Sequence, residues 1–543
     1  MISKRTTVTM GVILSLAVLA SCADASQQEE PITPADLILT TPPGSTPVDH
    51  VTWGLPSGEP TSLDPIKIGD DASNTVESNL CENVMRLEPD FSVAPNLANS
   101  AQWVDDTTFV IDLRPNIRFW DGTTATAEDL AYSMSRNLDP EGESVYSSAY
   151  TNVVTVDASG PNEVTVQFSA HDSQFLNALA SPAGALQQRQ YVEDEGESVG
   201  TPDGGLMCTG PFELDYWRPG DKIATKANED YWQGIVPKVA NLDFEFIPDD
   251  STLTTALASG EVDGAYTIPN ASINILRGSN KGSVYFGPGT ASLSFGPTTS
   301  EGPAADPVVR EALDLAIDKR QYIATALGGY GEPLATFTPP FAFAGMDAAD
   351  VYQEGYDALE PGRYDLDEAK RLMSTVSLDR TDLVYAVQAG QQASLTAATI
   401  VQSAARAIGL NISIRQMQAT DFANLFYSPE ARDGIDFVGT IGYVDTPGVL
   451  TYATEFARPE GLYNWSGYDD PVVTEDLAAA RMARDPQESA REFVSAQARF
   501  AKARLQVSLA QQFSTLYLND DLTGATVSIA YINSPWALNL GGK

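Results

Sequence analysis

Few side chains in this sequence belong to the types that carry out chemistry. Among its 543 residues are three cysteines, Cys22, Cys81 and Cys208, and two histidines, His50 and His171. The histidines lie far apart, and neither has the neighbours that a catalytic or metal-binding histidine needs. The sequence also lacks a serine nucleophile elbow, a phosphate-binding glycine loop and the ligand spacing of an EF-hand. We therefore expect no covalent catalysis, no cofactor and no metal site.

Cys22 stands at the end of an apolar segment near the N-terminus. Lys4 and Arg5 precede about a dozen apolar residues, the layout of a secretory signal, and this run is shorter than the roughly 20 residues of a membrane-spanning helix. Residues 19–22, Leu-Ala-Ser-Cys, resemble the bacterial lipobox, whose cysteine is acylated and becomes the mature N-terminus. We expect a signal peptide over residues 1–21 and a lipid on Cys22 that holds the protein on the extracytoplasmic face of the cell membrane. An ordinary signal peptide with a chance cysteine is the alternative.

Cys81 and Cys208 remain once Cys22 is assigned to the lipid. In an exported protein, two such cysteines indicate a disulfide more often than free thiols, although two buried thiols are the alternative. A metal site would need more ligands close by. If the bond forms, it closes a long loop and joins two distant segments.

The charge of the chain narrows its range of partners. Asp and Glu outnumber Lys and Arg by 73 to 32, which gives a formal net charge of −41. Nucleic acid binding depends on Lys and Arg side chains that neutralise phosphates, so it is excluded, and close contact with anionic lipid is disfavoured. An acidic protein could attract cationic ligands, and a well-solvated surface is the simpler interpretation.

The N-terminal half mixes strands and helices. Residues 22–49 are rich in Pro, Ser, Thr and acid, which predicts a flexible stalk, and order is expected from a strand that begins near Val51. Alternating residues predict a strand over 107–114. Helices are predicted after the cap Thr126 and over 253–258, where Gly260 ends the helix.

In the C-terminal half, the sequence predicts one helix over 307–327, with Asp306 and Pro307 as its start signals. From residue 382 to residue 445, strand and helix patterns alternate, which predicts a parallel sheet with crossover helices. Ligands of such sheets bind beyond the carboxyl ends of strands. The strand that ends near Tyr443 therefore makes Val444, Asp445 and Thr446 candidates for a binding site.

Four longer segments resemble a known family. They are "EPTSLDP" at 59–65, "LRPNIRFWDGTTATAEDLAYSMSR" at 113–136, "CTGPFELDYWRPGDKIATKANEDYW" at 208–232 and "VVREALDLAIDKRQYI" at 308–323. In order and spacing they resemble the extracytoplasmic solute-binding proteins of peptide-type ABC importers, the oligopeptide- and dipeptide-binding receptors of family 5. The resemblance extends from about Val51 to the C-terminus.

This resemblance implies an α/β fold of the periplasmic-binding-protein type, in which two lobes joined by a hinge enclose the ligand. It also implies an extra domain inserted near the N-terminus, and it supports a disulfide between Cys81 and Cys208 where that domain leaves and rejoins the first lobe. We expect lobe I over 50–81, 204–292 and 515–543, the inserted domain II over 82–203, and lobe III over 293–514.

The resemblance also implies binding residues. Peptide-binding relatives hold the ligand's ammonium group with an aspartate after a strand, the position that Asp445 occupies here. Gly442, Tyr443 and Val444 would bond the backbone of an extended peptide by strand addition. Many relatives have a tryptophan where this chain has Gly442-Tyr443, which leaves the class of ligand open. As an alternative, Asp445 could cap a helix that starts at Thr446 and Pro447.

Four further residues, Asp71, Tyr150, Asn464 and Trp465, fall in segments that face the cleft in this family. The function that the resemblance implies is that of a monomeric, lipid-anchored receptor that passes a peptide to an ABC permease. An oligosaccharide, an opine-like conjugate or a metal chelate is an alternative ligand. The remaining alternatives are an envelope lipoprotein without a transport role and a secreted hydrolase, for which the sequence offers no nucleophile.

Overall fold

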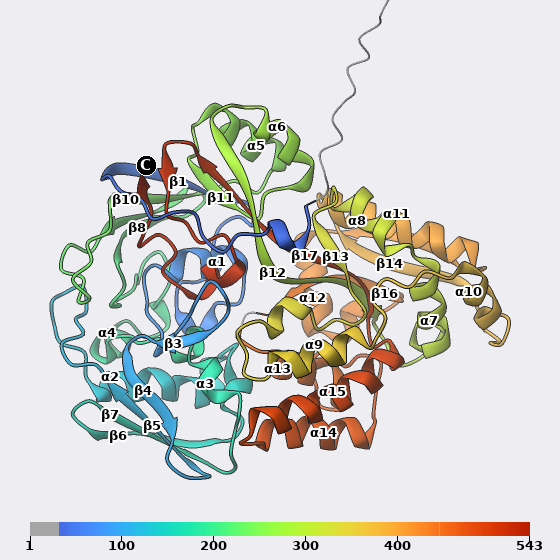
Figure 1. Cartoon of the computed structure of the whole chain (residues 1–543), viewed down its shortest axis with the longest axis horizontal. Helices are drawn as coiled ribbons and strands as arrows, with labels where there is room; N and C mark the ends of the chain where they lie inside the picture. Colours follow the sequence, from blue (N-terminus) through green and yellow to red (C-terminus); the bar gives the residue numbers. More distant parts are fainter. Residues whose placement is uncertain (1–31, 445) are drawn as a thin grey trace, which may run out of the picture. The chain divides into compact units, whose positions relative to one another are not determined.

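The computed structural model describes residues 32–444 and 446–543 (Figure 1). The predicted signal peptide over 1–21, the predicted lipid site Cys22 and the predicted ligand anchor Asp445 lie outside the described residues. Within the described ranges, no helix is both long enough and apolar enough to cross a membrane.

The largest sheet has eleven strands in the order β15-β14-β16-β12-β17-β11-β1-β10-β9-β8, with β13 paired to β17. The pairs β14–β15, β14–β16, β1–β10 and β1–β11 are parallel, and the remaining pairs are antiparallel. The sheet is therefore mixed, and the prediction of a parallel sheet holds only for β14, β15 and β16. The strands are β1 Val48–Leu55, β8 Phe212–Arg218, β9 Lys222–Ala227, β10 Val239–Phe246, β11 Gly264–Tyr266, β12 Gly282–Pro297, β13 Gly331–Pro333, β14 Asp382–Gln388, β15 Asn411–Met417, β16 Phe437–Tyr443 and β17 Val507–Asn519.

Two long strands connect the N-terminal and C-terminal parts of this sheet. The first half of β12 pairs with the end of β17, next to β11, and the second half of β12 pairs with both β17 and β16. The register of the β12–β17 pair shifts between Gly287 and Ala291. Such an irregularity bends the strands locally. The two strands therefore change direction at the point where the sheet passes from one part to the other.

A second sheet, β4-β5-β7-β6, lies inside the segment predicted as domain II. Helix α2 begins after Thr126, which forms a capping box with Asp129, as the sequence predicts. The apolar side of this sheet packs with α2 into a hydrophobic cluster that is separate from the clusters of the large sheet. The strands are β4 Ala98–Trp103, β5 Thr108–Leu113, β6 Val153–Gly160 and β7 Glu163–Phe168, and α2 spans Ala127–Ser135.

Cys81 and Cys208 form a disulfide just outside the two ends of this segment, with their Cα atoms 5.0 Å apart. Both cysteines are buried, and both belong to the hydrophobic cluster of the first part of the large sheet. The bond therefore fixes the place where the chain leaves that cluster and returns to it 127 residues later.

The remaining helices cover the sheets or pack in pairs, and α14 and α15 lie side by side (Figure 1). Four short strands form two small two-stranded sheets, β2–β3 and β18–β19. These helices and strands are α1 Asp71–Glu77, α3 Phe175–Ala178, α4 Arg189–Glu195, α5 Asp250–Ser259, α6 Ile273–Arg277, α9 Ala349–Asp357, α10 Leu366–Met373, α11 Gln392–Ala407, α12 Ala419–Tyr427, α13 Leu450–Ala457, α14 Pro471–Met482, α15 Pro486–Ala503, β2 Met85–Leu87, β3 Val93–Pro95, β18 Leu522–Thr523 and β19 Gly541–Gly542.

The single helix predicted over 307–327 is wrong, because the structure divides it into α7 Pro307–Ala316 and α8 Lys319–Ala326. Asp318 is the reason for the break. Its carboxylate accepts a hydrogen bond from the backbone N–H of Gln321 and caps α8, and a cap residue has a non-helical backbone. The apolar periodicity continues across the break, so periodicity alone does not reveal it.

The flexible stalk predicted over 22–49 is also wrong for its described part, residues 32–49. Thr46 pairs with Gly542, and the Thr41 hydroxyl accepts hydrogen bonds from the backbone N–H groups of Gly524 and Ala525. The segment lacks a periodic apolar face, but it is held by backbone and hydroxyl hydrogen bonds to the C-terminal segment. Such long-range pairing leaves no periodic pattern in the local sequence.

Candidate functional site

One face of β16 forms a wall of the larger cavity described here, with a volume of about 770 Å³. Val438, Thr440 and Gly442 on the strand and Val444 just after it line this cavity. Their spacing of two residues is that of one strand face. The Thr290 hydroxyl donates a hydrogen bond to the carbonyl oxygen of Val444, which fixes the chain as it leaves the sheet.

One edge of β16 is accessible for strand pairing. On one side, β16 pairs with β12 along its full length. On the other side, the ladder with β14 contains only Phe437 and Val438. From Gly439 onward, no strand in the described part of the chain pairs with this edge. An added extended chain can therefore pair with this edge through its backbone.

Aromatic side chains form the second wall of the cavity. The Trp465 ring lies 5.6 Å from the Phe426 ring and 6.1 Å from the Tyr463 ring, and Tyr463 packs against Phe456 at 5.2 Å. Tyr452 approaches the strand closely, because a Cβ atom at Gly442 would lie 2.5 Å from its hydroxyl oxygen. Glycine at position 442 therefore allows this contact. Such a wall suits apolar and aromatic groups of a ligand.

The third wall comes from the inserted segment. Residues 143–149, which follow α2 and precede β6, line the cavity together with Gly69, which lies in the loop just before α1. This wall contributes the hydroxyl-bearing residues Ser144, Ser147 and Ser148, and the carboxylate of Glu143. Segments from three distant parts of the sequence thus enclose the same space.

Four of the residues expected to bind ligand, Gly442, Val444, Thr446 and Trp465, line this cavity. Trp465 is held in place by a hydrogen bond from its Nε1 to the carbonyl oxygen of Leu462, 3.0 Å, and by the guanidinium of Arg432, 4.6 Å from its ring centre. The backbone of Tyr443 pairs with Ala291, whereas its side chain is outside the description.

Three other expected residues do not line either cavity. The Tyr150 side chain is 2% exposed, packs against Phe175 in the core of the inserted segment and donates its hydroxyl to the carbonyl oxygen of Ala183 at 2.6 Å. Asn464 donates to the carbonyl oxygens of Arg458 and Tyr468 and thereby closes a turn. Tyr150 and Asn464 therefore have structural roles.

Asp71 is the third of these residues. It is the first residue of α1, and its carboxylate accepts a hydrogen bond from the Tyr531 hydroxyl at 2.7 Å. Burial raises the pKa of Asp71, and the hydrogen bond from Tyr531 opposes that rise. The contacts tie α1 to the segment before the C-terminus.

The alternative role of Asp445, as the cap of a helix that starts at Thr446 and Pro447, is wrong. Helix α13 begins at Leu450, and its N-cap residue is Val449. The segment between β16 and α13 is therefore longer than the sequence suggests.

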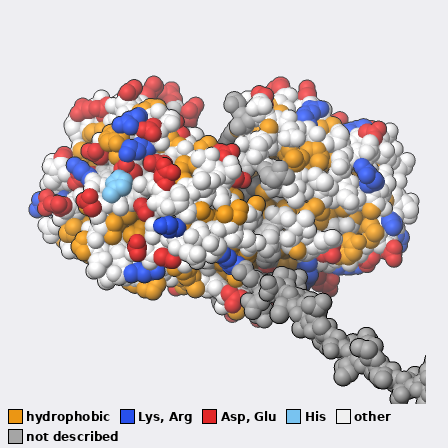
Figure 2. Space-filling view, turned by 90° about the horizontal axis from the view of Figure 1, so that it is seen from above, with side chains coloured by type: hydrophobic (Ala, Val, Ile, Leu, Met, Phe, Trp, Pro, Cys, Tyr) orange, Lys and Arg blue, Asp and Glu red, His pale blue; other side chains and the backbone are white. Residues whose placement is uncertain are grey.

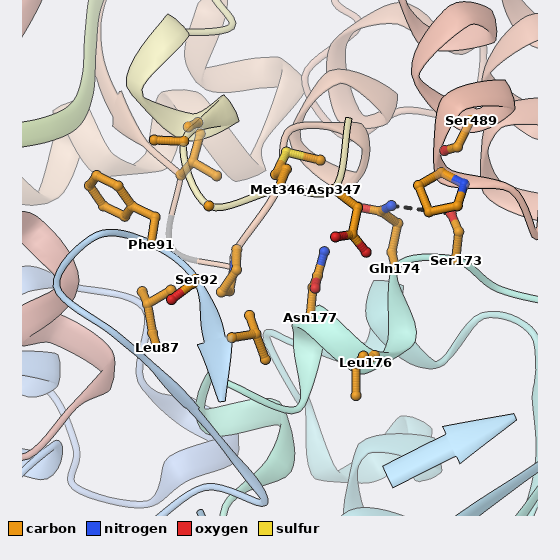
Figure 3. A pocket seen from close by; sticks show the side chains of 18 of the residues that line it. Leu87, Phe91, Ser92, Ser173, Gln174, Leu176, Asn177, Met346, Asp347 and Ser489 are labelled. Atoms are coloured by element: carbon orange, nitrogen blue, oxygen red, sulfur yellow. Dashed lines mark hydrogen bonds between the residues drawn. The ribbon is translucent and has the colours of Figure 1, made fainter. Parts of the chain in front are cut away.

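A smaller cavity of about 390 Å³ lies between the inserted segment and the segments around η10 (Pro340–Phe343), α9 and α15. In Figure 3 the side chains of Gln174, Asn177 and Asp347 lie near one another in it, with Met346 beside them. Val444 lines both cavities, so the chain that leaves β16 runs between them.

Sequence reasoning missed the inserted-segment residues 143–149 and Glu455, which also lines the larger cavity. Residues 143–149 show no periodic pattern, because they form turns and a short 3-10 helix. For the aromatic wall a signal existed, since Tyr452 and Phe456 are four residues apart on a helix that follows a strand end.

Comparison with known families supplies the last observation. Residues 92–464 match the family profile of the bacterial extracellular solute-binding proteins, family 5, middle part. The chain belongs to this family. Its sequence is 26% identical over 445 residues to the glutathione-binding protein GsiB of Salmonella typhi, a match that covers 80% of this chain and 84% of GsiB.

Solved structures confirm the predicted fold. The oligopeptide-binding protein AppA from Bacillus subtilis, in complex with a nonapeptide, matches with a TM-score of 0.78 and 18% identity, over 92% of this chain and 100% of AppA. NikA from Staphylococcus aureus, in complex with Ni(L-His)2, matches with a TM-score of 0.74 and 17% identity, over 89% of this chain and 98% of NikA. The family 5 protein described here thus has the mixed α/β, two-lobed periplasmic-binding-protein fold, and its relatives are solute-binding receptors.

Proposed function

We propose that this family 5 protein is a lipid-anchored receptor that captures a peptide between its lobes and delivers it to the permease of an ABC importer. The observation that carries the proposal is the edge of β16, free of a strand partner among the described residues beyond Val438, at the wall of a cavity of about 770 Å³. An extended peptide can add to such an edge through its backbone, independently of its sequence. ATP hydrolysis is then the task of another subunit.

The cavity dimensions agree with a ligand of several residues, since ligand sites have volumes of roughly 300–1,000 Å³. In this proposal 50–81, 204–292 and 515–543 form lobe I, 82–203 form domain II and 293–514 form lobe III. The larger cavity then lies where lobe III meets the other two. In this proposal the receptor acts as a monomer.

The experiment that tests the peptide proposal is to purify the protein natively, denature it and identify the released small molecules by mass spectrometry. We expect a set of peptides of similar length and mixed sequence. A single sugar, an opine-like conjugate or a metal chelate would overturn the peptide proposal. The aromatic wall of Tyr463 and Trp465 is what would favour a sugar or conjugate in that case.

Within this proposal, Asp445 binds the ammonium group of the peptide. Asp445→Asn removes the charge from that hydrogen bond and should weaken peptide binding by about 1.5–3 kcal/mol, the usual contribution of a hydrogen bond to a charged group. Titration calorimetry with one released peptide measures the change. The matched control is Asp433→Asn, an exposed residue outside the cavity lining, which should leave the affinity unchanged. Equal affinities for both variants would exclude the anchor role of Asp445.

Lipid attachment at Cys22 is a separate part of the proposal, supported by the lipobox-like residues 19–22. We expect intact-mass measurement of membrane-derived protein to show an acylated chain that begins at Cys22. Cys22→Ser should abolish acylation and release the protein from the membrane fraction. A soluble, unmodified chain in the parent strain would contradict the anchor.

A further inference from the structure

The charged side chains that line the larger cavity have one sign. Among the described lining residues, the only Asp, Glu, Lys, Arg or His residues are Glu143 and Glu455. No lysine, arginine or histidine is part of this lining. Arg432 is not part of the lining; its guanidinium stacks on the ring of Trp465 and donates to the carbonyl oxygen of Leu425.

The two carboxylates come from different segments of the chain that line the same cavity. Glu143 follows a short 3-10 helix of domain II, is exposed and has a left-handed backbone with φ of 51°. Glu455 lies on α13 of lobe III, is partly buried and accepts a hydrogen bond from the backbone N–H of Leu462 at 3.1 Å. Neither carboxylate forms an ion pair with a basic side chain in the described ranges.

Unpaired carboxylates at a cavity wall favour a ligand of opposite charge. Closure of the lobes around a ligand removes water from the cavity, which strengthens electrostatic interactions inside it. Two negative charges in the same closed cavity repel each other, and a bound cation offsets this repulsion by attracting both. The aromatic wall adds to this preference, since Trp and Tyr rings attract ammonium and guanidinium groups.

We propose that the ligand of this receptor is a cationic peptide, with a Lys or Arg side chain placed between Glu143 and Glu455 and apolar groups against the aromatic wall. The inference rests on the proposed peptide-receptor function and adds the charge class of the ligand. This charge class differs from that of glutathione, after which some relatives are named. Glutathione has two carboxylates and one ammonium group, and it would bring an excess of negative charge into an acidic cavity. The acidic surface points the same way, since Asp and Glu side chains are spread over the face shown in Figure 2.

The test uses three matched libraries of peptides two to eight residues long, each with one fixed position that holds Lys, Gln or Glu. The full-length protein is incubated with an equal mixture of the three libraries, and native mass spectrometry measures the peptides that remain bound. We expect Lys peptides to be enriched over Glu peptides by at least about tenfold, with Gln peptides between them, because one charge-assisted contact amounts to about one factor of ten. Added salt should reduce the enrichment.

Substitutions locate the cause of the preference. The double variant Glu143→Gln/Glu455→Gln keeps the shape of both side chains and should reduce the enrichment of Lys peptides to within about threefold. The matched control Glu475→Gln removes a charge from an exposed position of α14 outside the cavity lining, and should leave the enrichment unchanged.

The outcomes separate this inference from the proposal beneath it. If no library binds, the peptide-receptor function is overturned. If the libraries bind equally, or if Glu peptides bind best, the peptide receptor stands and the cationic preference is overturned. If the Lys preference survives the double substitution, Glu143 and Glu455 are not its cause.

Discussion

At the scale of single residues, two buried glutamates, Glu77 and Glu82, show how hydrogen-bond partners change the free-energy cost of burying a carboxylate. Glu77 on α1 is 1% exposed, and its Oε1 has no hydrogen-bond partner among the described residues. Burial raises the pKa of Glu77 well above its usual range, and the nearby charge of Asp64 adds to the rise. Burial also raises the pKa of Glu82, which accepts hydrogen bonds from Trp232, Tyr231 and Thr209.

We predict that Glu77→Gln stabilises the protein at neutral and higher pH. A carboxyl whose pKa is higher in the folded than in the unfolded state favours folding below the unfolded pKa. This contribution is lost as the pH rises through the folded pKa. Glutamine does not titrate, so the free energy of unfolding of the variant should fall less with pH than that of the parent protein. Urea denaturation between pH 4 and pH 8 measures both curves.

Glu82→Gln is the matched control for this prediction. It removes a carboxylate whose pKa is raised in the same direction, but the amide places an N–H₂ group among donors such as the Trp232 Nε1–H and the Thr209 hydroxyl. A buried donor that faces a donor lacks its hydrogen bond, which costs about 1–3 kcal/mol. We therefore expect Glu82→Gln to destabilise the protein at neutral pH. A stabilising effect of both variants, or of neither, would contradict this account.

At the scale of helices and strands, cap residues in the sequence correctly predicted where helices begin, because a helix start depends on neighbouring residues. Thr126 and Asp306 cap α2 and α7 as the sequence indicates, because a cap needs only a side-chain oxygen and the next backbone N–H groups. The break between α7 and α8 was missed although Asp318 is an equally good cap. The apolar periodicity that continues across Asp318 masks this cap, and the buried ion pair between Lys319 and Asp314, 2.7 Å, joins the two helices across the break.

Contacts between distant elements hold the inserted segment, proposed above as domain II, against helix α14, in the segment proposed as lobe III. Arg481, near the C-terminus of α14, pairs with the fully buried carboxylate of Asp172 at 2.7 Å, and donates to the carbonyl oxygen of Ser148 at 3.0 Å. Ser148 lines the larger cavity, so Arg481 also positions that wall. The backbone N–H of Ser173 donates to the carbonyl oxygen of Arg481 at 2.8 Å, which completes the contact.

We predict that Arg481→Met separates domain II from lobe III and weakens ligand binding. Loss of one partner of a buried ion pair costs about 3–5 kcal/mol when the other charge stays buried, and Asp172 can avoid this cost if the contact opens. The dissociation constant of the ligand should rise at least about tenfold, which corresponds to about 1.4 kcal/mol. The radius of gyration of the ligand-free protein, measured by X-ray scattering, should increase.

Arg484→Met is the matched control, since Arg484 pairs with Asp106 across the same pair of segments. Both side chains of this pair are mostly exposed, 60% and 68%, and exposed ion pairs contribute about 0–1 kcal/mol. The affinity and the radius of gyration should change little. Equal effects of the two substitutions would show that net charge, and not the buried pair, holds the domains together.

At the scale of the whole molecule, the binding cavity is the feature that the sequence predicts least well. The strand end after Gly442 could be predicted, because strand ends in alternating strand–helix segments follow a general rule. The wall of residues 143–149 could not, since it reaches the cavity only through the path of domain II. Tyr150 shows the difficulty: its neighbours line the cavity, while its own side chain points into the core of the domain.

The disulfide between Cys81 and Cys208 also connects parts of the chain that are far apart in sequence. It joins residues 127 positions apart, and it encloses a segment with its own sheet and hydrophobic cluster. In the chain-entropy account, a bond that closes so long a loop restricts the unfolded chain strongly, by about 4–5 kcal/mol at the upper end. Because neither cysteine lines a cavity, this stabilisation is separate from ligand binding.

We therefore predict that Cys81→Ala/Cys208→Ala lowers the free energy of unfolding by about 2–4 kcal/mol, the usual range for a lost disulfide, and leaves ligand affinity unchanged. Urea denaturation followed by fluorescence, and calorimetry with a bound peptide, measure the two quantities. The control is the parent protein unfolded and refolded under reducing conditions, which lacks the bond but keeps both sulfur atoms. If its stability matches that of the variant, the bond and not the packing of the sulfur atoms is the cause. A loss of affinity that equals the loss of stability would instead show that the link between lobe I and domain II also shapes the cavity.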